Sequence, residues 1–261
     1  MTEDKGTVNY EVDGPIGIIT LSRPDKRNAL TQHMFARLNE VVGDVENNGD
    51  LRVLIIRGES GSVFCAGDDL AELVAMDVVQ VRDFLIRTQG TLTRLETLPV
   101  PVVAAVEGHA LGGGLELALA CDLIVASSDA VLGLPETNLG VIPGLGGTIR
   151  LPRRVGLGRA RELVYSGRVV QADEAKNIGL VEAVYPAEEF DSKVMEFALF
   201  LASKSPSALA LAKSTINRGT DASLEAGLAL EREAFAYCFA LPDAKEGISA
   251  FLEKRKPVFE K

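Results

Sequence analysis

Three consecutive glycines shortly after an apolar run constrain the fold more than any other feature of the sequence. Residues 100–106 are apolar throughout, which is typical of a strand covered on both faces, and Gly112-Gly113-Gly114 follow a few positions later. Each glycine costs roughly 1 kcal/mol relative to alanine inside a helix, so the triplet disfavours a mid-helix position. We therefore expect a helix toward Leu119 to open at the triplet, and another group to approach the glycine backbone closely.

Two kinds of group could make this close approach. Tight packing of the new helix on the sheet is the structural explanation. A ligand is the functional one, because the free N–H groups and the positive dipole end of a helix start favour a developing oxyanion. Glu116 lies just after the triplet, within the first turn of the expected helix.

Strands and helices alternate through most of the chain. Paired strands are predicted at 8–12 and 16–21 around the turn Asp13-Gly14-Pro15, and an amphipathic helix runs from the N-cap Thr31 to Asn47. Further strands are predicted at 53–56, 122–126 and 131–134, with a second long helix at 78–98. This alternation favours an α/β sheet core built of right-handed crossovers.

The pattern changes beyond Pro186. Apolar spacing there predicts helices at 188–203, 206–218, 224–239 and 244–253. We expect this last quarter to form a helical appendage, whose apolar faces pack on the core or on a neighbouring subunit.

Composition excludes several classes of function. The 261 residues are 47% hydrophobic and 25% charged, and no run of 18 apolar residues occurs, so we expect a soluble, cytoplasmic protein without a membrane partner. A formal net charge of −10 repels phosphate backbones, which makes nucleic acid a poor partner. Cys65, Cys121 and Cys238 are far apart and lack clustered histidines, so neither a disulfide framework nor a metal site is predicted.

A second turn of small residues lies at 64–70. It follows a predicted strand and a loop, has Ala66 and Gly67 at its centre, and leads into a predicted helix. Such a turn can leave a backbone N–H unpaired and directed at a ligand. A simple helix-capping turn, with Asp68 or Asp69 as the cap, is the alternative.

Glu136 is a carboxylate in apolar surroundings. It follows Leu134 and Pro135, lies 20 positions after Glu116, and precedes the glycine-rich turn 140–147. Removal from water would raise the pKa of this carboxyl and suit it to proton transfer. Taken alone, Glu136 could equally be a structural or surface acid; beside Glu116 and two glycine turns, the functional interpretation gains weight.

Other catalytic chemistries have little support. His33 lies on a predicted helix and His109 beside the glycine turn, where solvation and packing explain them. The sequence contains no GxSxG, HExxH or Walker A motif. It therefore indicates neither a serine hydrolase nor a dinucleotide-binding dehydrogenase.

Five ordered motifs make the chain resemble the crotonase superfamily, which comprises enoyl-CoA hydratases and isomerases. They lie at 21–30, 64–70, 110–116, 134–147 and 251–256, and the resemblance spans nearly the whole chain. It implies an α/β fold, with a ββα spiral core at 1–200 and a C-terminal helical trimerisation region at 201–261. It also implies an acyl-CoA thioester substrate, no separate cofactor because coenzyme A is part of the substrate, and a homotrimer or homohexamer.

The resemblance further implies roles for individual residues. The thioester carbonyl would be held in an oxyanion hole by the backbone N–H groups of Asp68 and Gly113, so only the main chain of Asp68 would matter. Glu116 and Glu136 match the two acids of hydratases, with Glu116 as general base and Glu136 as the proton donor to the α-carbon. The other implied positions are Arg23, Lys26, Arg27, Ala66 and Lys254 for coenzyme A, and Leu70, Leu134 and Phe251 for the acyl pocket.

The presence of both acids favours hydration of a trans-2-enoyl-CoA to a 3-hydroxyacyl-CoA. The same skeleton also fits an enoyl-CoA isomerase that uses Glu136 alone, a hydratase for branched substrates such as 3-methylglutaconyl-CoA, and an acyl-CoA hydrolase. A non-catalytic thioester-binding protein would keep the glycine turns but not need two acids. Phe251 and Lys254 are expected to serve the site of a neighbouring subunit.

Overall fold

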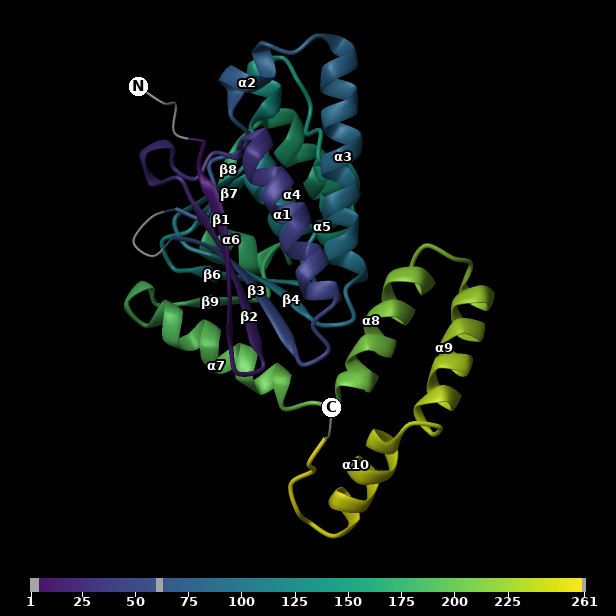
Figure 1. Cartoon of the computed structure of the whole chain (residues 1–261). Coiled ribbons are helices and arrows are strands. Elements are labelled where there is room, and N and C mark those ends of the chain that lie inside the picture. The colour runs from purple at the N-terminus through teal and green to yellow at the C-terminus, as the bar shows by residue number, and fades with distance from the viewer. Residues whose placement is uncertain (1–4, 60–62, 260–261) are drawn as a thin grey trace.

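A six-stranded sheet runs through the core of the molecule (Figure 1). The computed structural model describes residues 5–59 and 63–259. In the order β1-β2-β3-β4-β6-β9, the first pair is antiparallel and all later pairs are parallel, which confirms the predicted hairpin and the α/β class. The strands are β1 (Thr7–Asp13), β2 (Ile16–Ser22), β3 (Val53–Gly58), β4 (Val102–Val106), β6 (Leu123–Ser127) and β9 (Ala183–Tyr185).

A smaller sheet lies next to it and carries the glycine triplet. Its strands are β5 (His109–Leu111), β7 (Val131–Gly133) and β8 (Val169–Gln171), in the order β5-β7-β8. Helix α4 (Gly113–Leu119) begins directly after β5, as expected from the glycines. The triplet therefore occupies the corner between a strand and a helix.

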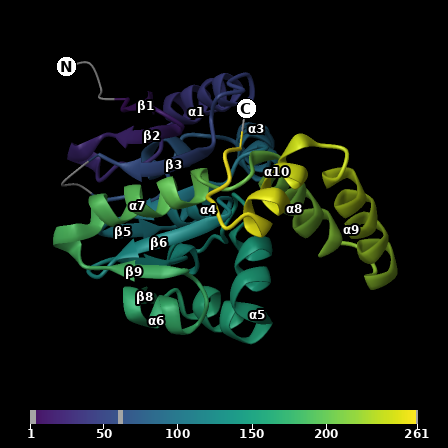
Figure 2. The same cartoon turned by 90° about the horizontal axis from the view of Figure 1, so that it is seen from below.

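Side chains that alternate along the strands of the large sheet pack into two hydrophobic cores. On β2, Ile19 and Leu21 face the larger core, while Ile16 and Ile18 face the smaller one. Helices α1 (Gln32–Glu46) and α3 (Val78–Thr97) cover the larger core, and α7 (Phe190–Ala202) covers the opposite face of the sheet (Figures 1 and 2). As predicted, the side chain of Thr31 caps α1 by accepting a hydrogen bond from the Met34 N–H.

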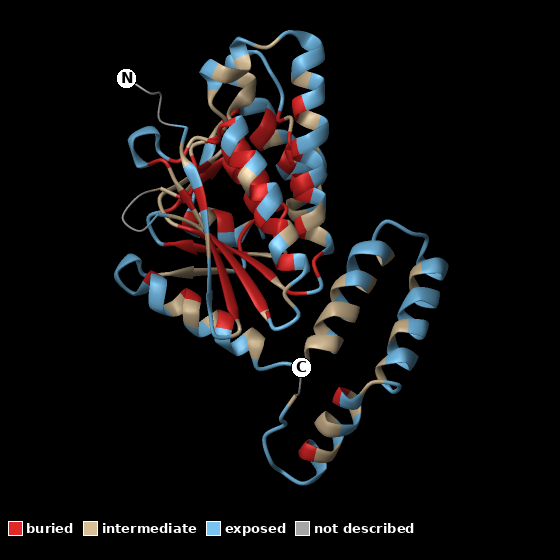
Figure 3. Cartoon of the chain, in the orientation of Figure 1, coloured by how far each residue is buried: buried red, intermediate tan, exposed pale blue. Residues whose placement is uncertain are grey.

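The C-terminal helices form an arm beside the core. Helices α8 (Pro206–Gly219), α9 (Leu224–Cys238) and α10 (Pro242–Leu252) end within two residues of their predicted limits, and few of their residues are buried (Figure 3). Helix α7 packs its apolar stripe on β-strand side chains of the core and does not join the arm. No single helix of the described chain is long and apolar enough to cross a membrane; residues 187–202 and 206–219 reach that length and composition only together, with a bend of 98°.

Several further helical elements complete the fold; a helix was predicted after the 64–70 turn, but the longest of these elements was not predicted. The longest is α5 (Gly147–Ser166), in which Gly156 leaves the helical conformation at a φ of 77°. The shorter helical elements are η1 (Pro24–Lys26), α2 (Leu70–Val74), η2 (Glu136–Leu139), α6 (Ala172–Asn177) and η3 (Ala187–Glu189). Helix α5 and η2 matter most for function, because both border the glycine corner.

Candidate active site

The two glycine turns lie against each other. The Cys65 N–H donates to the His109 oxygen at 2.9 Å, and the Leu111 N–H donates to the Cys65 oxygen at 3.0 Å, so the 64–70 turn runs beside β5. A Cβ placed on Gly114 would lie 2.4 Å from the Cys65 oxygen, a distance that no side chain tolerates. At Gly114, the group that approaches the glycine triplet is therefore the backbone of the chain itself. Close packing within the protein explains this glycine.

Two backbone N–H groups remain available at this contact. The Leu30 N–H donates to the Gly67 oxygen and the Asp69 N–H to the Leu30 oxygen, each at 2.8 Å, which leaves the intervening Asp68 N–H outside the ladder. Within residues 5–59 and 63–259, neither the Asp68 N–H nor the Gly113 N–H donates a hydrogen bond to the protein. A Cβ on Gly67 would lie 3.7 Å from the Gly113 nitrogen, so the two donors flank one small space.

The side chain of Asp69, rather than that of Asp68, caps the following helix. Asp69 accepts hydrogen bonds from the N–H groups of Ala71 and Glu72 at the start of α2. Of the two candidate caps, Asp68 is therefore left with no capping task.

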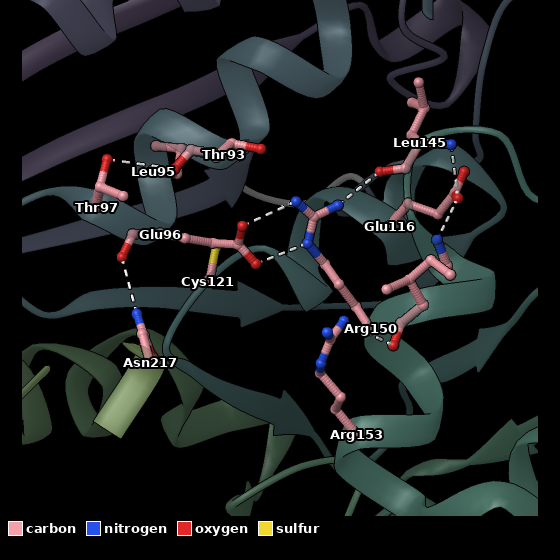
Figure 4. Close-up of polar contacts among 12 residues, drawn as sticks. Thr93, Leu95, Glu96, Thr97, Glu116, Cys121, Leu145, Arg150, Arg153 and Asn217 are labelled. Atoms are coloured by element: carbon pink, nitrogen blue, oxygen red, sulfur yellow. Dashed lines mark hydrogen bonds and ion pairs between the residues drawn. The ribbon is translucent and has the colours of Figure 1, made fainter. Parts of the chain in front are cut away.

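Glu116 is buried at the first turn of α4, where two backbone donors hold it. Its Oε1 accepts from the Leu145 N–H at 2.8 Å and from the Gly147 N–H at 2.6 Å (Figure 4). Burial raises the pKa of Glu116, while these N–H groups and the charge of Arg150 oppose the rise. The hydrogen bonds orient this carboxyl and favour its ionised form.

Arg150 fixes the loop that holds Glu116. Its guanidinium donates to the Leu145 oxygen at 2.7 Å and forms a forked pair with the two oxygens of Glu96, at 2.7 and 2.9 Å (Figure 4). Such bidentate pairs are strong and geometrically specific. Sequence reasoning missed Arg150 and Glu96, because 54 positions separate them and only the glycine-rich turn between 140 and 147 signalled the region.

Glu136 opens η2 and faces the same glycine corner. A Cβ on Gly112 would lie 3.3 Å from its Oε1, and neither carboxyl oxygen hydrogen-bonds to any described residue. Burial raises the pKa of Glu136 to about 7; its own backbone N–H opposes this rise, and the charge of Glu116 adds to it. Glu136 is thus suited to carry a proton at neutral pH.

The carboxyl of Asp68 lies at the same corner. A Cβ on Gly113 would lie 2.7 Å from its Oδ1, which is buried and has no hydrogen-bond partner among the described residues. Burial, followed by the charges of Glu116 and Glu136, raises the pKa of Asp68 to about 7. In the described part of the chain no three His, Cys, Asp or Glu side chains are arranged to hold a metal ion.

The predicted coenzyme A contacts fall into two groups. Lys26 and Arg27 are exposed and lie beside Ala66, whose N–H donates to the Arg27 oxygen at 3.0 Å. Arg23 differs, because only 3% of its side chain is exposed and its guanidinium pairs with Asp69 at 2.7 Å. Arg23 thus has a structural contact with Asp69, and its expected contact with coenzyme A stays a prediction.

The predicted acyl-pocket residues also divide. Leu134 is buried, and Leu134 and Glu116 both approach Gly147, whose added Cβ would lie 2.9 Å from one and 3.0 Å from the other. Leu70 is 55% exposed at the start of α2. Phe251, which is 82% exposed, and Lys254 belong to the α10 end of the arm, opposite α2 in Figure 1, so the chain does not bring them to its own Glu116.

Comparison with known proteins gives a consistent family. The family model described as enoyl-CoA hydratase/isomerase matches residues 11–261. The chain is 45% identical over 245 residues to the putative enoyl-CoA hydratase/isomerase YngF of Bacillus subtilis, with 94% of each chain covered. It is 41% identical over 249 residues to the short-chain-enoyl-CoA hydratase of Clostridium acetobutylicum, with 95% of each covered.

A solved structure agrees with the sequence relatives. The crystal structure of enoyl-CoA hydratase from Bacillus anthracis superposes with a TM-score of 0.93 at 41% identity, and the match covers 97% of this chain and 98% of that one. The fold, the paired acids at the glycine corner and these similarities together show that the chain belongs to the enoyl-CoA hydratase/isomerase family of crotonase-fold enzymes.

Proposed function

We propose that the protein is a hydro-lyase that reversibly adds water to a trans-2-enoyl-CoA and forms a 3-hydroxyacyl-CoA. The observation that carries this proposal is the difference between the two glutamates at one glycine corner. Glu116 accepts two backbone N–H groups, whereas the oxygens of Glu136 have no partner among the described residues. One acid is thereby prepared as a base and the other as a proton donor, as hydration requires.

The chemistry follows from this difference. The ionised Glu116 takes a proton from water as the water oxygen bonds to the β-carbon of the enoyl group. The C=C electrons move toward the thioester, and the negative charge that develops on its oxygen is stabilised by the Asp68 and Gly113 N–H groups. Protonated Glu136 then delivers its proton to the α-carbon, and a proton transfer from Glu116 to Glu136 restores the pair.

The direct test is hydration of crotonyl-CoA, followed by the loss of absorbance of the conjugated thioester. We expect Glu116→Gln and Glu136→Gln each to lower kcat by about 10²- to 10⁴-fold, because each removes one step of acid–base help. Glu188→Gln, which alters an exposed acid, is the control and should leave kcat unchanged.

The isomerase alternative makes the opposite prediction for Glu116. An isomerase that needs Glu136 alone would convert a 3-enoyl-CoA to the conjugated isomer, and Glu116→Gln would retain most of that activity. Absence of crotonyl-CoA hydration by the wild type, combined with such isomerisation, would replace the hydratase proposal.

The surface supports assembly into a closed ring, in which we place three copies. Exposed apolar residues gather on α9 and α10, and a different exposed group lies on η2, the loop after it and α5. Two unlike patches that pair head to tail close into a cyclic oligomer when the rotation allows. In that ring, Phe251 and Lys254 would serve the acyl and coenzyme A sites of a neighbouring copy.

A further inference from the structure

We propose that the side chain of Asp68 is a third ionisable group of the active site, whose neutral form permits turnover and whose ionised form blocks it. This inference rests on the proposed hydratase function. It departs from the expectation that only the main chain of Asp68 matters.

The first support is the position of the carboxyl. Asp68 supplies one of the two free N–H groups, and its own carboxyl packs on Gly113, which supplies the other. A Cβ on Gly113 would meet both oxygens of Asp68, at 2.7 and 2.8 Å. The Asp68 carboxyl therefore lies beside the space in which the thioester oxygen would become negative.

The second support is the lack of compensation for a charge there. Oδ1 of Asp68 is buried without a partner in the described chain, unlike the carboxyl of the adjacent Asp69, which pairs with Arg23 and caps α2. A buried carboxylate without donors is costly, whereas its protonated form is not. Burial and its acidic neighbours accordingly raise the pKa of Asp68 to about 7.

Among the residues that the structure describes, the groups around Asp68 add negative charge and supply no neutralising cation. Glu116 faces it from α4 and Glu136 from η2, and both raise its pKa. On its own turn, the buried Cys65 thiol has a pKa raised to about 12 and stays neutral. The cation next to Glu116 is Arg150, and two nitrogens of its guanidinium pair with the Glu96 carboxylate rather than with Asp68.

The consequence is a two-proton requirement. An ionised Asp68 would repel the developing enolate oxygen, and an ionised Glu136 could not protonate the α-carbon. With both groups titrating at a pKa of about 7, log kcat/KM should fall above pH 8 with a slope approaching −2. Hydration would then become about 100-fold slower for each further pH unit. A single ionisation would slow it only about tenfold per pH unit.

The test is the pH profile of crotonyl-CoA hydration from pH 5 to 10. Asp68→Asn keeps the shape of the side chain but cannot ionise, so its alkaline slope should approach −1, and its rate relative to wild type should rise about tenfold per pH unit. Asp68→Ala should show the same slope, which separates the loss of ionisation from the new amide. Asp44→Asn, an exposed acid on α1, should keep the wild-type slope.

The outcomes separate the two proposals. An active wild type whose alkaline slope is −1, or is the same in Asp68→Asn, Asp68→Ala and Asp44→Asn, would overturn the role of Asp68 and leave the hydratase proposal standing. A wild type inactive on crotonyl-CoA at every pH would refute the hydratase proposal. An infrared difference spectrum of wild type minus Asp68→Asn at pH 6 tests the side chain without turnover; a protonated-carboxyl band is expected, and only a carboxylate band would overturn the inference.

Discussion

At the scale of single residues, the site assigns different tasks to chemically similar acids. Glu116 accepts two N–H groups and Asp69 pairs with Arg23. One oxygen of Asp68 and both oxygens of Glu136 are buried and have no hydrogen-bond donor among the described residues. Hydrogen bonds to a carboxylate favour its charge, and burial without them favours the proton. The local backbone, more than the identity of the side chain, therefore determines which acid is the base.

The raised pKa of Asp68 predicts a pH-dependent cost to folding. The pKa of an aspartate in an unfolded chain is about 3.9, whereas the pKa of Asp68 in the folded chain is raised to about 7. Between these values only the folded chain holds the proton, so this residue lowers the stability of the wild type as the pH rises through that window. In urea unfolding, Asp68→Asn should therefore gain stability relative to wild type between pH 4 and 8, by at most about 4 kcal/mol.

The control for this stability prediction is Asp44→Asn, which changes the net charge equally on an exposed face of α1. Its difference from wild type should stay constant across the same pH range. A difference between Asp68→Asn and wild type that is equally constant would show that the folded chain ionises Asp68 normally.

The sequence predicted the two glutamates of the site but not the state of the residues around them. Glu116 and Glu136 were identifiable from the glycine turns beside them and from the resemblance. The burial of Arg23 and the unpartnered oxygen of Asp68 depend on contacts between segments that lie far apart in the chain. Such contacts determine how far each side chain is removed from water, which a local sequence pattern does not indicate.

At the scale of elements, α5 positions Glu116, the base of the proposed mechanism. In the first turn of α5, the Gly147 N–H donates a hydrogen bond to Glu116. Arg150, three residues further along the helix, donates to the Leu145 oxygen and to Glu96. Helix α5 thereby links the glutamate on α4 to the end of α3. A shift of this helix would therefore move Glu116, the proposed general base.

Arg150→Lys tests this link, because lysine cannot form the forked pair with Glu96. A misplaced base should lower kcat for crotonyl-CoA by about 10- to 100-fold and leave KM within about threefold. Arg153→Lys is the matched control, since Arg153 lies one turn along α5 and forms an exposed pair with Asp221. Equal losses in both variants would mean that Arg150 contributes only general stability.

Elements with an unbroken periodic pattern were predicted well, and interrupted ones were missed. The C-terminal helices and α1 have regular apolar spacing, and α1, α8 and α9 have side-chain caps, so their limits agree within two residues. Helix α5 contains Pro152 and the non-helical Gly156, which break the pattern. Strands β8 and β9 have three residues each, too few for an alternation to be visible.

At the scale of the whole molecule, the arm is tied to the core by polar contacts. Lys213 of α8 pairs with Asp122 at 2.6 Å and donates to the oxygens of Leu95 and Val100, while Asn217 donates to the Glu96 oxygen. The apolar residues of α9 remain exposed beyond these contacts. The polar contacts thus anchor α8 on its own core, and the exposed apolar residues of α9 are available for the packing on another copy that we propose.

Disruption of the exposed face of α9 should therefore separate the copies without unfolding the core. Phe235 is 67% exposed and packs edge-on against Phe239, so burying this pair between subunits would contribute about 1.5 to 3 kcal/mol for each ring. We expect wild type to have three times the monomer mass, or six times if trimers pair. Phe235→Asp should sediment as a monomer. Its KM for crotonyl-CoA should be higher, because Phe251 and Lys254 would no longer reach a neighbouring site. Val78→Asp, at the exposed start of α3, adds the same charge outside the arm and should keep the wild-type mass. A monomeric wild type would contradict the ring, and an oligomeric Phe235→Asp would remove α9 from the contact between its copies.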